Sequence, residues 1–380
     1  MINFVVMKIF FLFIILFLFN SAVDAQTNDI TIESISKSIL QSNTTEEQKV
    51  TAVFNWVTDN IAYDVDNMFN INFYEKPQQT IDRTIKTKKG VCQHYAYLFD
   101  TLCKSVGLQS YIISGFTKQK KYVDFMPHAW CAAKVDGAWK LYDPTWAAGY
   151  IDNSTNKFVR ERNILYFETS PQKMIQNHIP FDCIWQLLEH PISYHDFSNG
   201  KFISNNTINF NDSIHLFFKQ NELEQKQNLL RRIENSGVAN QLVFDRINHL
   251  KNDISNIISM RYVNDFNTVV NEFNDAIKYD NEYINFYNVQ FTPKKSDIEI
   301  QQMLDEVEKH NSTAKKLLKN IGSAPENFIG TSPKAIIDQV NDLDKKVEGQ
   351  KEFVKKYIGT AKLFRKTLFY KYTIYGIPIN

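Results

Sequence analysis

Three residues, well apart in the chain, have side chains suited to thiol-based acyl transfer. Cys92 opens a helical pattern that ends near Gly107, so its thiol would lie in the first turn of a helix. The positive end of the helix dipole and the unpaired N–H groups of that turn favour the thiolate, which is the nucleophilic form of cysteine. Such a cysteine needs a base within hydrogen-bond reach if it is to attack a carbonyl.

A predicted hairpin supplies the candidate base. An Asp-Gly dipeptide at positions 136–137 separates two strand-like runs, and this dipeptide is a strong signal for a two-residue turn. A two-residue turn pairs Val135 with Ala138 and thereby fixes the register of both strands.

This register places a histidine beside a carboxylate. Counting outward from the turn, Trp130 opposes Asp143, and His128 lies two residues further along on the same face. His128 is then the diagonal neighbour of Asp143, at about 7–8 Å between the backbones. A carboxylate in this place orients the imidazole ring and favours its protonated form. A three-residue loop would place Asp143 on the other face and separate the pair.

Each of the three residues also has a purely structural interpretation. Cys92 could be a core thiol, His128 a hydrogen-bonded structural histidine, and Asp143 a carboxylate at a strand end or turn. A zinc site made by Cys92, His94, His128 and Cys131 is a further alternative. It is disfavoured because no Cys-x-x-Cys pair is present and Cys131 would point away from His128. We therefore expect neither a metal nor a cofactor.

Taken together, these motifs resemble the core of the transglutaminase-like superfamily. They read Gly-Val-Cys at 90–92, His-Ala-Trp at 128–130, and Asp-Gly-x-Trp-x-x-x-Asp-Pro-Thr-Trp at 136–146. The helical segment at 54–64 resembles the one that precedes this core. Each piece alone is a weak signal, but their combined order and spacing are highly specific. The resemblance covers roughly residues 40–200 and is closest to the kyphoscoliosis-peptidase-like and bacterial branches.

The resemblance implies a fold and a reaction. The fold is papain-related α+β, with the cysteine-bearing helix packed on an antiparallel sheet. The activity is amide-directed acyl chemistry on a protein or peptide substrate, with Cys92 as the nucleophile, His128 as the base and Asp143 as the orienting residue. An acidic cluster like the calcium sites of animal transglutaminases is not evident, which argues against calcium dependence. Water as the acceptor would give hydrolysis, and an amine would give cross-linking.

The chain is expected to have three parts. Residues 1–25 read as a signal peptide, residues 26–204 as the catalytic domain, and residues 205–380 as a helical domain. In the last part, apolar residues recur at three- and four-residue steps from Gln241 to Tyr287, then from Ile298 to Leu318, and again from Pro333 to Leu368. This period predicts a helical bundle or an antiparallel coiled coil.

The first segment has the pattern of an export signal. Ile9–Phe19 is an unbroken apolar run of 11 residues preceded by Lys8, and small residues follow at Val23 and Ala25. The run is short for a membrane span, which needs about 20 residues. We expect cleavage before Gln26 and a periplasmic or secreted protein without a membrane span, and an uncleaved anchor is the alternative.

The composition excludes several broad classes. The chain has 380 residues, is 43% hydrophobic and has a formal net charge of +1. This apolar content excludes wholesale disorder, and the near-neutral charge gives no reason to expect nucleic acid as a partner. Two functional hypotheses remain: an exported cysteine enzyme, or a non-catalytic scaffold whose helical region binds a protein partner.

Overall fold

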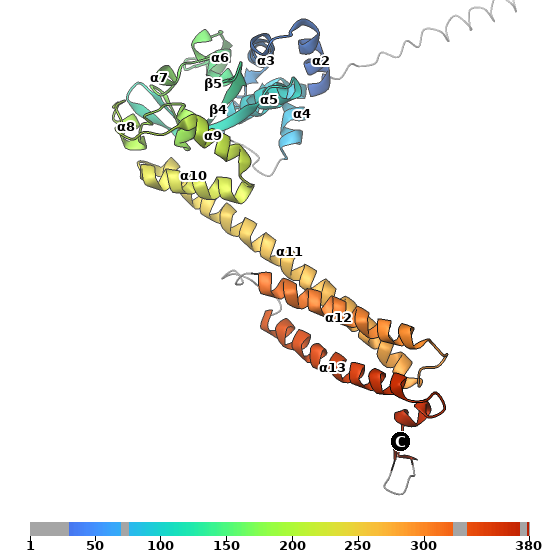
Figure 1. Cartoon of the computed structure of the whole chain (residues 1–380). Helices are drawn as coiled ribbons and strands as arrows, with labels where there is room; N and C mark the ends of the chain where they lie inside the picture. The colour runs from blue at the N-terminus through green and yellow to red at the C-terminus, as the bar shows by residue number, and fades with distance from the viewer. Residues whose placement is uncertain (1–29, 70–75, 322–332, 373–377, 380) are drawn as a thin grey trace, which may run out of the picture. The chain divides into compact units, whose positions relative to one another are not determined.

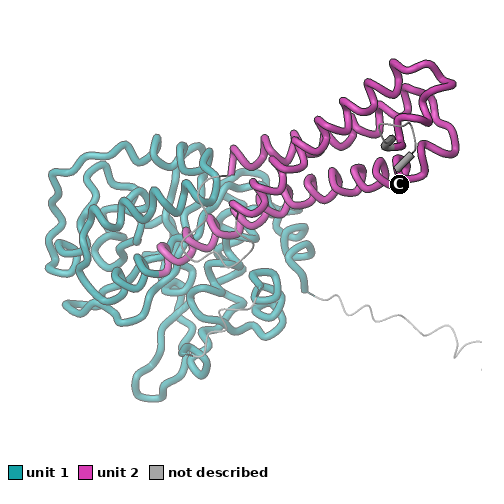
Figure 2. The backbone as a smooth tube through the Cα atoms, turned by 90° about the horizontal axis from the view of Figure 1, so that it is seen from below, with its two compact units in different colours: residues 1–248 teal, residues 249–380 magenta. Residues whose placement is uncertain are grey.

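The computed structural model describes residues 30–69, 76–321, 333–372 and 378–379. The expected signal peptide lies outside the described residues. The fold class is α+β, as expected, with a sheet-containing part followed by a largely helical part. The chain divides into two compact units, residues 1–248 and residues 249–380 (Figure 2).

A four-stranded antiparallel sheet forms the centre of the first unit (Figure 1). Its strand order is β5-β4-β3-β8, and the strands are β3 Ser110–Gln119, β4 Tyr122–Val135, β5 Ala138–Tyr142 and β8 His178–Pro180. Two small sheets accompany it. A parallel pair joins β1 Ala62–Tyr63 to β2 Lys89–Gly90, and an antiparallel pair joins β6 Gly149–Asp152 to β7 Lys157–Arg160.

The predicted hairpin is confirmed. Val135 pairs with Ala138 between β4 and β5, and both turn residues have positive φ angles, 51° at Asp136 and 82° at Gly137. Positive φ at both positions is the requirement of a type I′ turn, which explains the Asp-Gly dipeptide. Strand β5 ends at Tyr142, so the following residue leaves the sheet and caps the next helix.

Helices surround the sheet and hold the catalytic candidates in place. In chain order they are α2 Ile32–Ser42, α3 Glu46–Asn60, α4 Pro77–Thr87, α5 Cys92–Ser105, α6 Pro144–Ala148, α7 Pro171–Met174, α8 Tyr194–Ser198, α9 Phe210–Lys219 and α10 Glu222–Ser236, with 3₁₀ turns at η1 Ile164–Tyr166 and η2 Cys183–Gln186. Helix α5 is amphipathic and packs its apolar side into the main core with α3 and one face of β4. Its fully buried residues include Leu98, Phe99 and Cys103.

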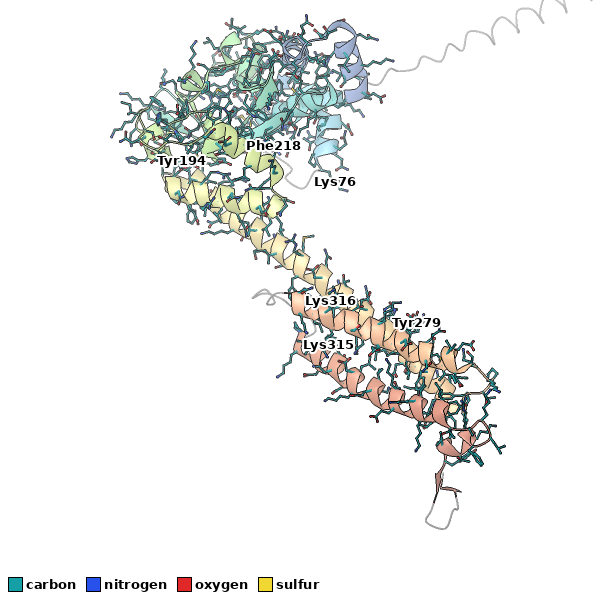
Figure 3. The ribbon with its side chains drawn as sticks, in the orientation of Figure 1. Lys76, Tyr194, Phe218, Tyr279, Lys315 and Lys316 are labelled. Carbon is teal, nitrogen blue, oxygen red and sulfur yellow. The ribbon has the colours of Figure 1, made fainter. Side chains whose placement is uncertain are left out.

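A second cluster packs on the other face of β4. Trp130 and Trp185 are buried there together with Ile214 and Phe217 of α9. Phe218 of α9, labelled in Figure 3, stacks on Trp139 of β5 with ring centroids 5.7 Å apart and planes 6° apart. Helix α9 therefore belongs to the sheet unit.

The two compact units divide at residues 248/249, and α9 and α10 lie in the first of them, whereas the sequence predicts that the helical domain begins at residue 205. Arg232 of α10 makes a two-pronged ion pair with Asp182, with both N–O distances at 2.7 Å. Together with the packing of α9, this pair holds the start of the helical region against the sheet unit. Composition alone gives no sign of this, because α9 and α10 are ordinary amphipathic helices.

The second unit is built on three long helices. They are α11 Gln241–Asn288, which begins in the first unit, α12 Asp297–Asn320 and α13 Pro333–Gly359. The expected long helices are thus confirmed, but the third ends at Gly359 and is followed by a 3₁₀ turn, η3 Arg365–Phe369. Two short strands, β9 Lys371–Tyr372 and β10 Pro378–Ile379, complete the unit. In the described part of the chain, no helix has the length and apolarity needed to span a membrane.

Candidate active site

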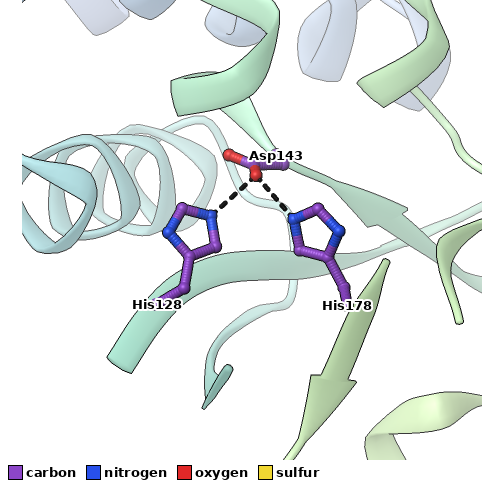
Figure 4. A group of neighbouring side chains, drawn as sticks. All are labelled: His128, Asp143 and His178. Atoms are coloured by element: carbon purple, nitrogen blue, oxygen red, sulfur yellow. Dashed lines mark hydrogen bonds and ion pairs between the residues drawn. The ribbon is translucent and has the colours of Figure 1, made fainter. Parts of the chain in front are cut away.

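Asp143 is the centre of a buried hydrogen-bond network (Figure 4). It caps α6, and its Oδ1 accepts from the backbone N–H groups of Thr145 at 2.8 Å and Trp146 at 3.1 Å. Its Oδ2 accepts from the Nε2 atoms of His128 at 2.8 Å and His178 at 2.9 Å. A carboxylate offers about four acceptor positions, so all of them are used.

The network keeps Asp143 ionised. Burial raises the pKa of this carboxyl group, but the positive charge of His128 and the hydrogen bonds from both imidazoles lower it further than burial raises it. The resulting pKa lies well below the ordinary value. Asp143 is therefore an anion at neutral pH, fixed in orientation by its neighbours.

His128 gains a strong preference for its protonated form from the same contact. Burial lowers the pKa of this ring, but the charge and hydrogen bond of Asp143 and the interaction with Cys92 raise it to about 10. Nε2 of His128 faces Asp143, which leaves Nδ1 as the ring nitrogen for any other contact. The ring also packs between Trp130 and Trp146, with centroids 6.0 Å and 5.8 Å away. These contacts restrict its rotation.

Cys92 is the first residue of α5, as the sequence predicted. The chain enters this helix through a tight approach, because a Cβ atom on Gly90 would lie 2.5 Å from the Cβ of His94. His94 Nδ1 accepts a hydrogen bond from the N–H of Val91 at 3.1 Å and fixes the turn before the cysteine. The start of the helix is therefore determined by Gly90 and His94.

The half-buried thiol of Cys92 is shifted toward the thiolate. Burial raises its pKa, but hydrogen bonding to His128, the charge of that ring and the N–H of Ala129 together lower the pKa below the ordinary value. The other thiols differ. Burial raises the pKa of Cys183 to about 11 and takes those of Cys103 and Cys131 well above the ordinary value. Cys92 is therefore the thiol with an environment suited to nucleophilic chemistry.

A cavity of about 750 Å³ lies next to this network, which is large enough for a peptide side chain. His128 lines it, but Cys92 is not among the described lining residues. Its wall is rich in aromatic and apolar side chains, many of them from the β6–β7 hairpin and the loop that follows: Tyr63, Trp146, Tyr150, Ile151, Phe158, Ile164 and Tyr166. Polar side chains line it as well: Gln119, Thr145, Asn153, Glu161, Arg162 and Asn163. The cavity therefore offers a mixed polar and aromatic surface that includes one imidazole.

His178 is the site residue that the sequence reasoning missed. It is fully buried on the edge strand β8, where it pairs with Thr117 of β3, while His128 pairs with Gly115 of the same strand. A Cβ atom on Gly115 would lie 2.6 Å from the Trp130 ring, so this glycine leaves space between the two histidine-bearing strands. No spacing motif links His178 to the other residues, because only the pairing of β8 with β3 brings it there.

His128, Asp143 and His178 also form a candidate metal cluster, with ligand atoms within 4.8 Å of one another. Asp143 already has four hydrogen bonds, however, and a cation would have to displace both imidazole contacts. The residues thus satisfy one another without an ion. The alternative zinc set is not assembled, since Cys131 donates to the carbonyl of Ala96 at 3.5 Å and His94 is held by Val91.

Comparison with known proteins identifies the class of the domain. Residues 33–144 match the family model described as the transglutaminase-like superfamily, and this segment includes Cys92, His128 and Asp143. Residues 33–144 therefore form a transglutaminase-like domain, as the motifs predicted.

Two curated relatives resemble the same part of the chain. Kyphoscoliosis peptidase of Mus musculus is 31% identical over 191 residues, covering 47% of this chain and 28% of the relative. Kyphoscoliosis peptidase of Homo sapiens is 31% identical over 179 residues, covering 45% and 26%. The chain thus spans about a quarter of the length of these relatives. A crystal structure of a TGase covers 40% of this chain and 41% of its own, at 22% identity and a TM-score of 0.27.

Proposed function

We propose that this chain is an exported, thiol-dependent enzyme that transfers acyl groups from amides through a Cys92–His128–Asp143 triad. The observation that carries the proposal is the buried contact between His128 and Asp143, because a buried histidine–carboxylate pair is suited to stabilising an imidazolium. The lowered pKa of Cys92 supports it, since this shift favours the thiolate.

The reaction follows from these protonation states. The thiolate of Cys92 attacks an amide carbonyl, and His128 gives its proton to the nitrogen as the C–N bond breaks. An amine leaves and a thioester remains on Cys92. The oxyanion lies near the N-terminus of α5, where the Cys92 N–H can donate to it.

The acceptor in the second step decides the outcome. His128, now neutral, takes a proton from water or from an amine, and the acceptor attacks the thioester. Water gives a peptidase or amidase reaction, and an amine gives a protein cross-link. We propose a protein or peptide as the substrate because the cavity beside His128 is large enough for a peptide side chain and has both aromatic and polar groups in its wall.

A non-catalytic scaffold is the second candidate. It is favoured by one observation: residues 249–380, a compact helical unit, lie outside the segment that matches the superfamily. A partner-binding role for these helices is compatible with either candidate. Only a measurement of catalytic activity distinguishes the enzyme from the scaffold.

The test is turnover by the purified protein on a peptide substrate and on a glutamine-containing protein with a tagged primary amine. We expect cleavage or amine incorporation with the native chain and neither with Cys92→Ala. Cys183→Ala is the matched control, because this thiol is also half-buried but has a raised pKa. Equal turnover in Cys92→Ala, or none in a folded native chain, would favour the scaffold.

A further inference from the structure

His178 lies in the candidate site, but the proposed triad gives this residue no role. Its side chain is fully buried, and its Nε2 lies 2.9 Å from the same oxygen of Asp143 that His128 contacts (Figure 4). A buried imidazole whose N–H lacks a hydrogen-bond partner would lower the stability of the fold. Here the N–H is used on the carboxylate of the site, which suggests a role in the reaction.

We propose that His178 is a positioning residue that fixes the Asp143 carboxylate for His128. The inference rests on the proposed function of the triad. The two backbone N–H groups hold only Oδ1, so without His178 the Oδ2 atom would have His128 as its one hydrogen-bond partner. The second imidazole gives Oδ2 another partner and keeps the oxygen 2.8 Å from His128 Nε2.

The proton positions follow from the acceptors. Asp143 Oδ2 can only accept, so the proton of His178 must be on Nε2. Burial lowers the pKa of His178, which favours the neutral ring with this single proton. Nδ1 is then an acceptor, and the two imidazoles have different tasks: His178 donates permanently, whereas His128 exchanges its Nδ1 proton with the thiol.

His178 is itself held from the cavity side. The Asn177 carboxamide contacts His178 Nδ1 through its oxygen at 2.6 Å and the Tyr166 hydroxyl through its nitrogen at 3.0 Å. Rotating the Asn177 carboxamide by 180° exchanges its oxygen and its nitrogen. In that orientation its NH₂ group donates to Nδ1 of the neutral His178 ring, and its oxygen accepts from the Tyr166 hydroxyl. Tyr166 lines the cavity, so a hydrogen-bond chain runs from the cavity wall to Asp143.

Packing fixes the ring as well. The centroid of Trp146 lies 4.5 Å from that of His178 in an edge-on arrangement, and that of Trp130 lies 5.2 Å away. An aromatic replacement can therefore fill the same space without the hydrogen bond. This allows the hydrogen bond to be separated from the packing.

The experiment compares His178→Phe, which keeps a ring but lacks the donor, with His178→Gln, which keeps a donor. The first readout is the downfield ¹⁵N-bound proton of His128 Nε2, recorded by NMR in the Cys92→Ala background. This readout does not depend on catalysis. We expect a sharp, slowly exchanging signal in the parent and His178→Gln, and a broadened or lost signal in His178→Phe.

The second readout is the rate at which iodoacetamide alkylates Cys92 at pH 6 in the native background. We expect a fall of about tenfold or more in His178→Phe and partial recovery in His178→Gln, as is common for residues that orient catalytic groups. Ile179→Val is the matched control, because Ile179 is buried on the same strand with its side chain on the other face.

An unchanged His128 signal and an unchanged rate in folded His178→Phe would overturn the proposal. If that variant does not fold, Asn177→Ala removes the support of the ring instead, and the same broadening is expected. A sharp signal in Asn177→Ala would then count against the proposal. An inert Cys92 in the native chain, with the NMR pattern intact, would refute the triad and leave the positioning of Asp143 by His178 standing.

Discussion

Replacing Asp143 with asparagine tests how the site controls its protons. The carboxamide has the same size, and its oxygen can still accept from the N–H groups of Thr145 and Trp146. Its NH₂ group would then face the two imidazoles and donate to them. His128 Nε2 must become an acceptor, so its proton moves to Nδ1, and the ring can no longer accept a proton from Cys92.

The size of the effect follows from the pKa of His128. Its rise from 6.5 to about 10 corresponds to about 5 kcal/mol in favour of the imidazolium, most of it due to Asp143. Without the anion, burial lowers the pKa of His128 below its ordinary value. At pH 7 the protonated fraction would fall from nearly all molecules to about a quarter or less.

The assay is the second-order rate constant for alkylation of Cys92 by iodoacetamide between pH 5 and pH 10. In the native chain the rate should rise at a lower pH than it does for an ordinary thiol, because the pKa of Cys92 is lowered, and a second change is expected where His128 loses its proton near pH 10. In Asp143→Asn the rise should move to higher pH. Turnover should fall by up to about 10⁴-fold, the size expected when a catalytic histidine adopts the wrong tautomer.

Asp182→Asn is the control for loss of a buried carboxylate. Asp182 is 6% exposed and pairs with Arg232 in the same unit, but it makes no contact with the triad residues in the described network. This variant should lose stability and keep the native alkylation profile. Native rates and an unshifted profile in Asp143→Asn would refute the reasoning.

Three further predictions concern stability and processing. Gly90→Ala should lower the free energy of unfolding by about 1–3 kcal/mol, because the new Cβ atom meets His94. Gly349→Ala, where the new Cβ atom meets open space, should be neutral or stabilising. Urea denaturation measures both changes. The contribution of His128 to stability should be complete below its unfolded pKa near 6.5 and be lost as the pH rises to about 10. The contribution of Asp143 should be lost as the pH falls below about 4. Denaturation midpoints across this pH range measure both contributions, and midpoints that do not change with pH would contradict the pairing. Expression in an exporting host should give a mature N-terminus at Gln26, and Edman sequencing that returns Met1 would favour an uncleaved anchor.

The sequence predicted the register of the β4–β5 hairpin and the start of α5, because both follow from local rules. The Asp-Gly turn fixes the register of β4 and β5 through backbone geometry alone, so the approach of His128 to Asp143 could be deduced by counting. The start of α5 at Cys92 likewise follows from the apolar period and the glycines near each end. Both results depend on interactions between residues close in the chain.

The position of His178 and the division between the units depend on long-range contacts, which a single sequence does not reveal. His178 reaches Asp143 because the three-residue strand β8 joins the sheet at its edge, and a strand this short has no readable period. The division between the units falls within α11, because α9 and α10 pack against the sheet part through contacts such as Arg232 with Asp182. An amphipathic pattern shows that a helix buries one face, but it does not show which element that face packs against.

The central claim is that one thiol of four is activated, and site-resolved alkylation tests it most directly. The native chain is treated with limiting iodoacetamide at pH 6, and each cysteine is quantified by peptide mass spectrometry. The lowered pKa of Cys92 and the raised pKa values of Cys103, Cys131 and Cys183 predict that Cys92 is modified well before the others. Modification of Cys92 no faster than of Cys183 would contradict the account.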